Sequence, residues 1–309
     1  MHNIFANVLP IFLIALLGSV ARRKWLRSNE FWRGLEKVSF FVLFPAVLFE
    51  HTSKLDVSTS DFFDLVFGLI IANLLVCFAL ILYQRKYNFD NVQFTSVFQG
   101  ATRYNSYIFF AIGSALYGDQ GLVVISAISP YLLIFTNITA ITVFYFYSSD
   151  TTSMGILKGI ILLVKSICTN PFILASAIGF IFGYFQVDLS GGVFNTIKIL
   201  ADSAFAIGMM IVGASIKIKV DPIYMNQVLY TTLIKLIIMP IITWMILWNL
   251  SITGIEKSVG VLFSCLPCAS SSYILSRQLG GDPDTMSSII TCTTIFSILS
   301  LSLMMYILV

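Results

Sequence analysis

The chain has 309 residues, of which 58% are hydrophobic and only 11% are charged, and its formal net charge is +3. Soluble domains carry about 25% charged residues, so this composition excludes a water-soluble globular protein. The small net charge and the lack of a lysine-rich run argue against a nucleic-acid partner. Repeated apolar runs of about 20 residues, enough for a helix to cross roughly 30 Å of hydrocarbon, indicate an all-α polytopic membrane protein.

Ten apolar segments are predicted to be transmembrane helices, joined by short connections. The first five lie at about 4–21, 37–53, 62–83, 93–116 and 121–147. The second five lie at about 163–185, 193–215, 228–249, 258–279 and 285–308. The five cysteines all fall in apolar runs, which is typical of small hydrophobic side chains rather than of a disulfide framework.

Lysine and arginine are distributed unequally between the connections, with 12 in the odd-numbered connections and three in the even-numbered ones. Cytoplasmic loops of membrane proteins are enriched in these residues, so the odd-numbered connections are predicted to be cytoplasmic. The chain is therefore predicted to be a multi-pass protein of the cell (plasma or inner) membrane, surrounded by lipid bilayer, with both termini non-cytoplasmic.

The ten helices divide into two halves of five, residues 1–150 and 151–309. An odd number of helices in each half makes the second half inverted relative to the first. "PIFLIALLG" (10–18) and "PFILASAIG" (171–179) match at an offset near 161. Inverted repeats are typical of secondary transporters, which bind substrate near the membrane midplane. The alternative is that apolar helices simply resemble one another.

The fourth helix carries Arg103 about eleven residues from its start, with Asn105 beside it. A charge at the bilayer centre costs roughly 2.5–3.5 kcal/mol, so Arg103 must face protein, water or a counter-ion. Pro267 lies near the middle of the ninth helix, where it bends or breaks the helix. Ser270 and Ser271 follow it and offer hydroxyl groups. If both helices break, they form a positively polarised substrate site at mid-membrane depth.

Several side chains also have simpler interpretations. Arg103 is alternatively paired with a carboxylate such as Asp202, and Pro267 alternatively makes an ordinary kink. Asp202 follows Lys198 by four residues, which favours a structural ion pair, with a proton- or ion-coupling role as the alternative. Lys235 is expected to extend to the cytoplasmic surface, with a place beside the site as the alternative. Other polar residues within helices, Asn73 and Asn137, are predicted to line contacts between them.

Five motifs resemble those of the auxin efflux carrier family, in matching order over nearly the whole chain. They are "FFVLFPAVLFEHTS" (40–53), "RYNSYIFFAIGSALYGDQGL" (103–122), "NPFILASAIGF" (170–180), "KLIIMPII" (235–242) and "LPCASSSYILSRQLGGD" (266–282). The chain most resembles the bacterial malate/malonate-permease-like branch of that family.

This resemblance implies ten helices in two inverted repeats, with the fourth and ninth helices broken and crossed at Asn105 and Pro267. It also implies a mobile bundle that moves against a scaffold made of spans one, two, six and seven. Many relatives have a proline in the fourth span, and this chain has Phe109, Phe110 and Ala111 where one is expected. A symmetric crossing is therefore an open question for this sequence.

The function predicted from these features is secondary active transport of small organic anions, such as dicarboxylates or auxin-like carboxylates, by alternating access. The site residues are Arg103, Asn105, Pro267, Ser270 and Ser271, with Asp202 and Lys235 in coupling or structural roles. No cofactor or metal is expected, whereas coupling to protons or Na⁺ and a homodimer are left open. The alternative is a cation/proton antiporter of related fold. An enzyme is not expected, because the two histidines, His2 and His51, belong to no catalytic constellation.

Overall fold

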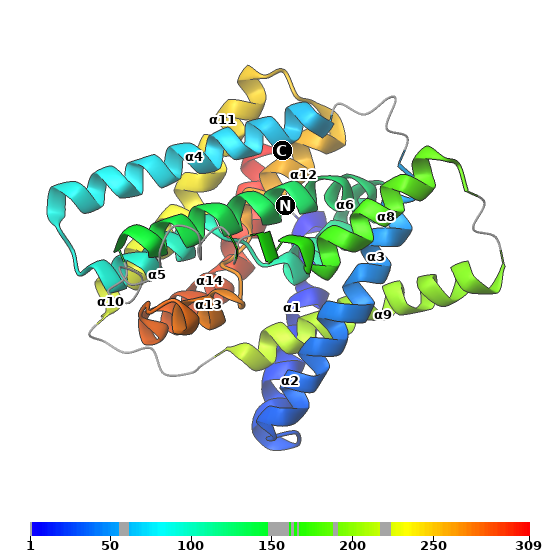
Figure 1. The fold of residues 1–309 in the computed structure, drawn as a ribbon, viewed down its shortest axis with the longest axis horizontal. Helices are drawn as coiled ribbons and strands as arrows, with labels where there is room; N and C mark the ends of the chain where they lie inside the picture. The colour runs from blue at the N-terminus through cyan, green and yellow to red at the C-terminus, as the bar shows by residue number, and fades with distance from the viewer. Residues whose placement is uncertain are drawn as a thin grey trace.

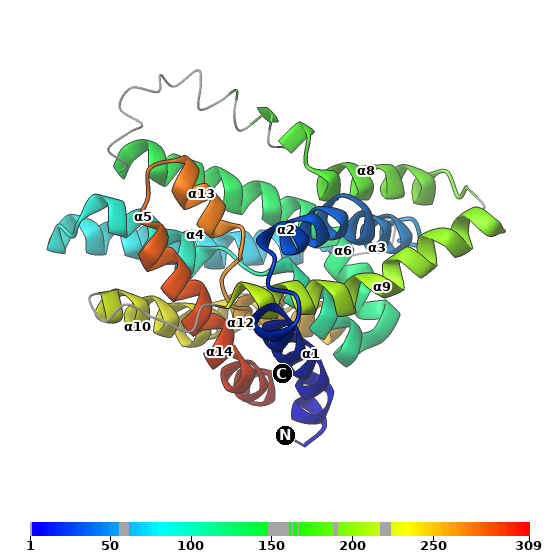
Figure 2. The same ribbon diagram turned by 90° about the horizontal axis from the view of Figure 1, so that it is seen from below.

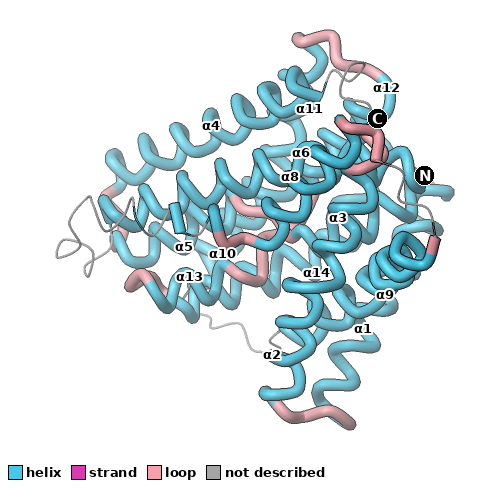
Figure 3. Tube along the Cα trace, turned by 45° about the vertical axis from the view of Figure 1, so that its right-hand side comes forward, coloured by secondary structure: helices cyan, strands magenta, loops and turns pink. Residues whose placement is uncertain are grey.

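The computed structural model describes residues 2–55, 62–147, 161, 164–165, 167–187, 191–216 and 224–309. Over these ranges the chain consists of helices, turns and loops without a β-strand (Figure 3). The helices of the first half are α1 (His2–Lys24), α2 (Asn29–Val38), η1 (Ser39–Leu43), α3 (Phe44–Thr52), α4 (Phe62–Tyr87), α5 (Asn91–Thr102) and α6 (Ser106–Tyr147). Those of the second half are α8 (Pro171–Tyr184), α9 (Gly192–Ser215), α10 (Met225–Leu233), η4 (Ile234–Ile238), α11 (Met239–Asn249), α12 (Gly254–Cys265), α13 (Ser272–Gln278) and α14 (Pro283–Leu308).

Six helical segments of the described chain are long and apolar enough to cross a membrane. They are Ile4–Lys24, Phe62–Tyr87, Asn91–Tyr147, Gly192–Ser215, Met225–Asn249 and Pro283–Leu308. The Asn91–Tyr147 segment has 57 residues, nearly three times the roughly 20 that one crossing needs. Repeated apolar helices of this length make the chain a multi-pass membrane protein.

The helices pack in two groups that lie side by side (Figure 1). In the first, α1 packs along α9, and α3 packs against both α8 and α9. We call α1, α2, η1, α3, α8 and α9 the α9 group. In the second, α4 packs against α11, α11 against α12, and α14 against α5, α10, α12 and α13. We call α4, α5, α10, η4, α11, α12, α13 and α14 the α14 group, and α6 contacts both groups.

Small residues allow α1 and α9 to approach at backbone distance. A β-carbon added at Gly213 would overlap the backbone carbonyl of Ala15, and one added at Gly18 would overlap the carbonyl of Met210. Lipid tails are as apolar as these side chains, so moving a side chain from lipid into a helix contact gives little hydrophobic stabilisation. Helix pairs in a membrane are therefore held largely by close packing. The paired glycines therefore allow the close backbone contact that holds α1 against α9.

Two π-helical turns each lead into a proline. η1 is followed by Pro45 and η4 by Pro240, each at the second residue of the next α-helix. Proline has no N–H and its ring clashes with the carbonyl four residues earlier, so the wider π-turn relieves both problems while the helix continues. The helix from Asn29 to Thr52 and the helix from Met225 to Asn249 are consequently bent rather than broken.

The long helix α6 changes direction at Gly118, which has φ 57° and ψ −147°, values that L-residues with a side chain rarely adopt. This turn separates the predicted spans 93–116 and 121–147. Both chain termini lie on the same side of the molecule (Figure 2). The predicted boundary between the halves, at residues 150 and 151, and part of the predicted span 163–185 lie outside the described residues.

The glycine contact between α1 and α9 yields a stability prediction. Gly213→Ala is expected to destabilise the protein by about 1–3 kcal/mol, because the new methyl group meets backbone atoms that cannot rotate away. The measurement is the melting temperature of the purified chain in detergent. Gly34→Ala is the matched control, since nothing lies within 4 Å of its added β-carbon. An equal melting temperature for Gly213→Ala and Gly34→Ala would contradict this packing.

Candidate functional site

The fourth predicted span is interrupted at residues 103–105. Helix α5 ends at Thr102 and α6 begins at Ser106. Arg103 between them is extended, with φ −84° and ψ 156°. The interruption lies within the apolar helical segment Asn91–Tyr147. Inside a membrane such irregular backbone is tolerated only where it is buried in protein or lines a cavity.

This break forms without a proline, because two asparagine side chains stabilise the helix ends it creates. The Asn105 Oδ1 atom accepts a hydrogen bond from the Ile108 N–H at 3.2 Å and so caps the first turn of α6. The Asn73 Nδ2 group of α4 donates to the Thr102 carbonyl at 3.0 Å. Asn73 was predicted only to line a helix contact, and here it bonds a carbonyl that the end of α5 leaves free.

The ninth predicted span is interrupted as well. Helix α12 ends at Cys265, and α13 begins only at Ser272. Leu266 is extended, with φ −69° and ψ 145°, as expected for the residue before a proline. The six residues between the helices show that Pro267 makes a break, so the alternative of an ordinary kink is wrong.

The two interruptions contact each other through the backbone. The Asn105 N–H donates to the Pro267 carbonyl at 2.9 Å, and the Asn105 Nδ2 group donates to the Ser270 Oγ atom at 3.3 Å. The Cys268 N–H donates to the Thr293 Oγ1 atom of α14 at 3.3 Å. We call this contact between residues 103–105 and 266–271 the crossing. It satisfies backbone groups of two broken helices at one place.

Arg103 is buried in the crossing, with 8% of its surface exposed. Its guanidinium donates to three side-chain oxygens, which are Gln99 Oε1 at 3.2 Å, Asn137 Oδ1 at 3.1 Å and Ser271 Oγ at 3.4 Å. All three acceptors are neutral. No ion pair of Arg103 with a carboxylate occurs among the residues the structure describes, which overturns the alternative that Asp202 neutralises it.

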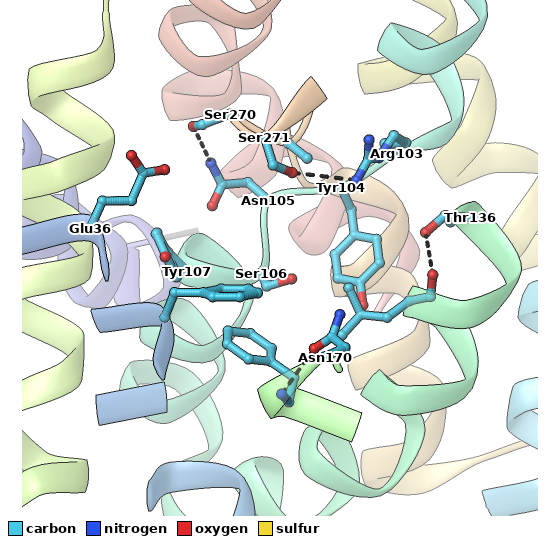
Figure 4. Close-up of a pocket in the computed structure, with 14 residues that line it drawn as sticks. Glu36, Arg103, Tyr104, Asn105, Ser106, Tyr107, Thr136, Asn170, Ser270 and Ser271 are labelled. Carbon is cyan, nitrogen blue, oxygen red and sulfur yellow. Dashed lines mark hydrogen bonds between the residues drawn. The ribbon is translucent and has the colours of Figure 1, made fainter. Parts of the chain in front are cut away.

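A cavity of about 120 Å³ opens beside the crossing, between the two helix groups. Figure 4 shows Asn105, Ser270 and Ser271 on one side of it and Glu36 on the other. The aromatic rings of Phe40, Tyr107 and Phe172 form much of its wall. The complete lining is Glu36, Phe40, Arg103, Tyr104, Asn105, Ser106, Tyr107, Leu133, Thr136, Asn170, Phe172, Ala269, Ser270 and Ser271.

The cavity is electrically asymmetric. One side carries the Arg103 guanidinium, from the break between α5 and α6. The helix α6 also begins at the cavity wall, and the first N–H groups of a helix have no partner within it. An α-helix carries about half a positive charge at its N-terminus, so these groups favour an anion. The α9 group supplies one carboxylate, Glu36. The cavity therefore has groups that can bind a carboxylate, Arg103 and the start of α6, and an acidic group, Glu36, that faces them.

Sequence reasoning missed Glu36 because this residue precedes the predicted span 37–53, in the first connection, where only lysines and arginines were counted. The structure places Glu36 in a continuous helical stretch from Asn29 to Thr52. Asn170 and Phe172, at the start of α8, were also not predicted to belong to the site.

A second cavity, of about 360 Å³, lies within the α14 group between α4, α5 and α10. None of the described residues that line it is charged, so they offer nothing to neutralise an organic anion. Its lining is Leu80, Tyr83, Phe89, Gln93, Phe94, Val97, Asn226, Gln227 and Tyr230.

Asp202 and Lys235 lie outside the crossing cavity. Asp202 is exposed on α9, and within the described ranges it forms no ion pair with Lys198. Lys235 was expected to extend to the cytoplasmic surface, and this expectation is wrong. Its side chain is 0% exposed and lies in the π-turn η4. Its Nζ atom has no hydrogen-bond partner among the described residues and lies 5.9 Å from the centre of the Phe263 ring in α12.

These features define the class of protein: a multi-pass membrane protein with two broken helices that meet beside a small polar cavity. The sequence matches the model of the membrane transport protein family over residues 3–305, and the chain belongs to that family. The family is the one that the auxin efflux carrier motifs indicated. The chain is also similar to an uncharacterized transporter of Methanothermobacter thermautotrophicus, with 24% identity over 310 residues, covering 96% of each chain.

The bond between Asn73 and the break yields the second prediction. Asn73→Leu is expected to destabilise the protein by about 1–3 kcal/mol, because it leaves the buried Thr102 carbonyl without its donor. The melting temperature in detergent reports this loss. Asn249→Leu is the control, because the Nδ2 group of Asn249 bonds its own helix on the exposed surface at Met245, and we expect a change of at most about 0.5 kcal/mol there. A stable Asn73→Leu variant would contradict the proposed role of Asn73.

Proposed function

We propose that the protein is a secondary active transporter of small organic anions, with the crossing cavity as its substrate site. The single observation that carries this proposal is the buried Arg103, whose three side-chain partners are all neutral. A buried charge that forms no ion pair among the described residues is unfavourable. A bound carboxylate supplies that counter-ion and accepts the charge-assisted hydrogen bonds that a guanidinium makes best.

The other groups around the cavity support the same ligand. The N-terminal turn of α6 favours an anion, and the hydroxyl groups of Ser270 and Ser271 can each donate to a carboxylate oxygen. The Asn105 amide fixes the direction of the α6 turn through its cap on Ile108. Asn105 and Pro267 hold the two broken helices together and so keep these donors on one side of the cavity.

The size of the cavity favours the smaller acids. Pockets for drug-sized ligands have volumes of about 300–1,000 Å³, and this cavity has about 120 Å³. A dicarboxylate with a few carbon atoms suits this volume better than a carboxylate attached to an aromatic ring system. Within the substrates predicted from the sequence, we therefore propose small dicarboxylates.

The arrangement of the helices supports transport by alternating access. The α9 group contains predicted spans one, two, six and seven, and the cavity lies at its boundary with the α14 group. We propose that the α14 group carries the crossing past the α9 group and exposes the site to each side in turn. In this proposal the even number of spans, ten, puts both termini on the same side of the membrane, and the excess of lysine and arginine in the odd-numbered connections makes that side the non-cytoplasmic one.

Loss of the two central donors tests the proposal. Arg103→Ala and Asn105→Ala are each expected to lower kcat/KM for labelled malonate or malate uptake into proteoliposomes at least about tenfold, since hydrogen bonds to charged groups contribute about 1.5–3 kcal/mol. The control is Arg85→Ala, which removes an exposed arginine in the last turn of α4. Its uptake should equal that of the parent.

Two results would contradict the proposal. One is unchanged uptake in both site variants that remain folded, as judged by melting temperature. The other is proton flux driven by Na⁺ with no organic anion present, which is the behaviour of a cation/proton antiporter. An ion gradient, of protons or Na⁺, is the energy source that the proposed carrier requires.

A further inference from the structure

Among the residues that the structure describes, Glu36 is the one carboxylate in the lining of the crossing cavity. It comes from α2, in the α9 group, and Figure 4 shows its side chain across the cavity from Asn105 and Ser270. It is partly buried, and within the described residues its two carboxylate oxygens take part in no hydrogen bond or ion pair. An acidic group therefore faces the side of the cavity that attracts anions.

The charged and titratable groups around Glu36 do not neutralise it. Arg33 on its own helix is exposed, and Tyr107 on α6 is a neutral neighbour. The helices that pack on α2 are η1 and α9. The η1 turn has no charged residue, and the charged residues of α9, Lys198 and Asp202, are exposed. Arg103 lines the same cavity but bonds Gln99, Asn137 and Ser271.

The charges in the cavity then depend on the state of Glu36. With Glu36 ionised, its charge offsets that of Arg103, and a bound dicarboxylate adds two negative charges to a neutral cavity. With Glu36 protonated, the cavity keeps the net positive charge of Arg103. Like charges that share a poorly solvated site disfavour each other's ionised form, so an anion in the cavity favours protonation of Glu36.

We propose that Glu36 takes up one proton when the cavity binds its organic anion, so that anion and proton occupy the site together. The step adds a proton from water to a Glu36 carboxylate oxygen and breaks no other bond. The resulting O–H group is a donor, so a repulsion between two carboxylates becomes a hydrogen bond from Glu36 to the substrate. This inference rests on the proposed function and assigns the coupling role to Glu36 in place of Asp202.

Calorimetric titration of the purified full chain with malate tests this directly. Carboxyl groups titrate at about pH 4–5, so the titrations are run between about pH 7 and pH 9, where malate carries both negative charges and its own protons do not interfere. Repeating the titration in buffers of different ionisation enthalpy gives the number of protons taken up. We expect close to one proton per malate for the parent, and an affinity that falls by up to about tenfold per pH unit, the limit for one linked proton.

Two variants locate the proton. Glu36→Gln imitates the protonated side chain, so it should bind malate with an affinity independent of pH and with no proton uptake. Glu30→Gln removes an exposed acid from the first turn of the same helix and should behave as the parent does. The measurement on the parent requires no variant, so poor folding of Glu36→Gln would not prevent the test.

The outcomes separate the two proposals. Malate binding by the parent without proton uptake, or proton uptake that persists in Glu36→Gln, overturns the role of Glu36 and leaves the transporter proposal intact. Tighter binding at higher pH also overturns it, because an ionised Glu36 would then favour the ligand. If neither malate nor malonate binds the parent at any pH, the proposed function fails and the coupling proposal fails with it.

Discussion

The architecture depends on one constraint, which is that backbone groups inside a membrane must be hydrogen-bonded within the protein. Two helices of this chain stop midway, and each stop would leave several N–H and C=O groups without partners. The bond from the Asn105 N–H to the Pro267 carbonyl joins the two stops, and Asn73 and Thr293 bond further groups from neighbouring helices. The first of these bonds forms only when the two segments lie together, so each break supplies a partner to the other.

This constraint also explains why the polar residues gather at one place. Arg103, Ser270 and Ser271 sit on irregular backbone, which is tolerated at this depth only where it is enclosed by protein or lines a cavity. The same break places the start of α6 in the wall of the cavity. The cavity is thus lined by the end of a broken helix and one arginine, which are the groups on which the proposed anion site rests.

The division of the helices into two groups gives the site its two sides. Close packing at Gly18 and Gly213 holds α1 against α9, whereas the cavity separates the α9 group from the crossing. Arg103 and the Asn105 amide lie on one side and Glu36 on the other (Figure 4). Movement of one group against the other would therefore change the electrostatic surroundings of a bound anion as well as its access to water.

The sequence by itself determined that this is a membrane protein. With 58% hydrophobic residues arranged in long runs, the chain can expose its apolar surface only to lipid. It also indicated a bend or break at Pro267, which removes a backbone donor, and showed that Arg103 could not face lipid. The break at Asn105 was implied only by the family resemblance, because the fourth span has no proline there. Tertiary structure alone decided which groups meet. Helical periodicity does not reveal that Asn73 bonds Thr102, that Lys235 is enclosed, or that Asp202 faces outward. Glu36 entered the site for the same reason: its role depends on a helix packing across from residues about 70 and 230 positions away, and such distant pairings are set by packing rather than by local sequence.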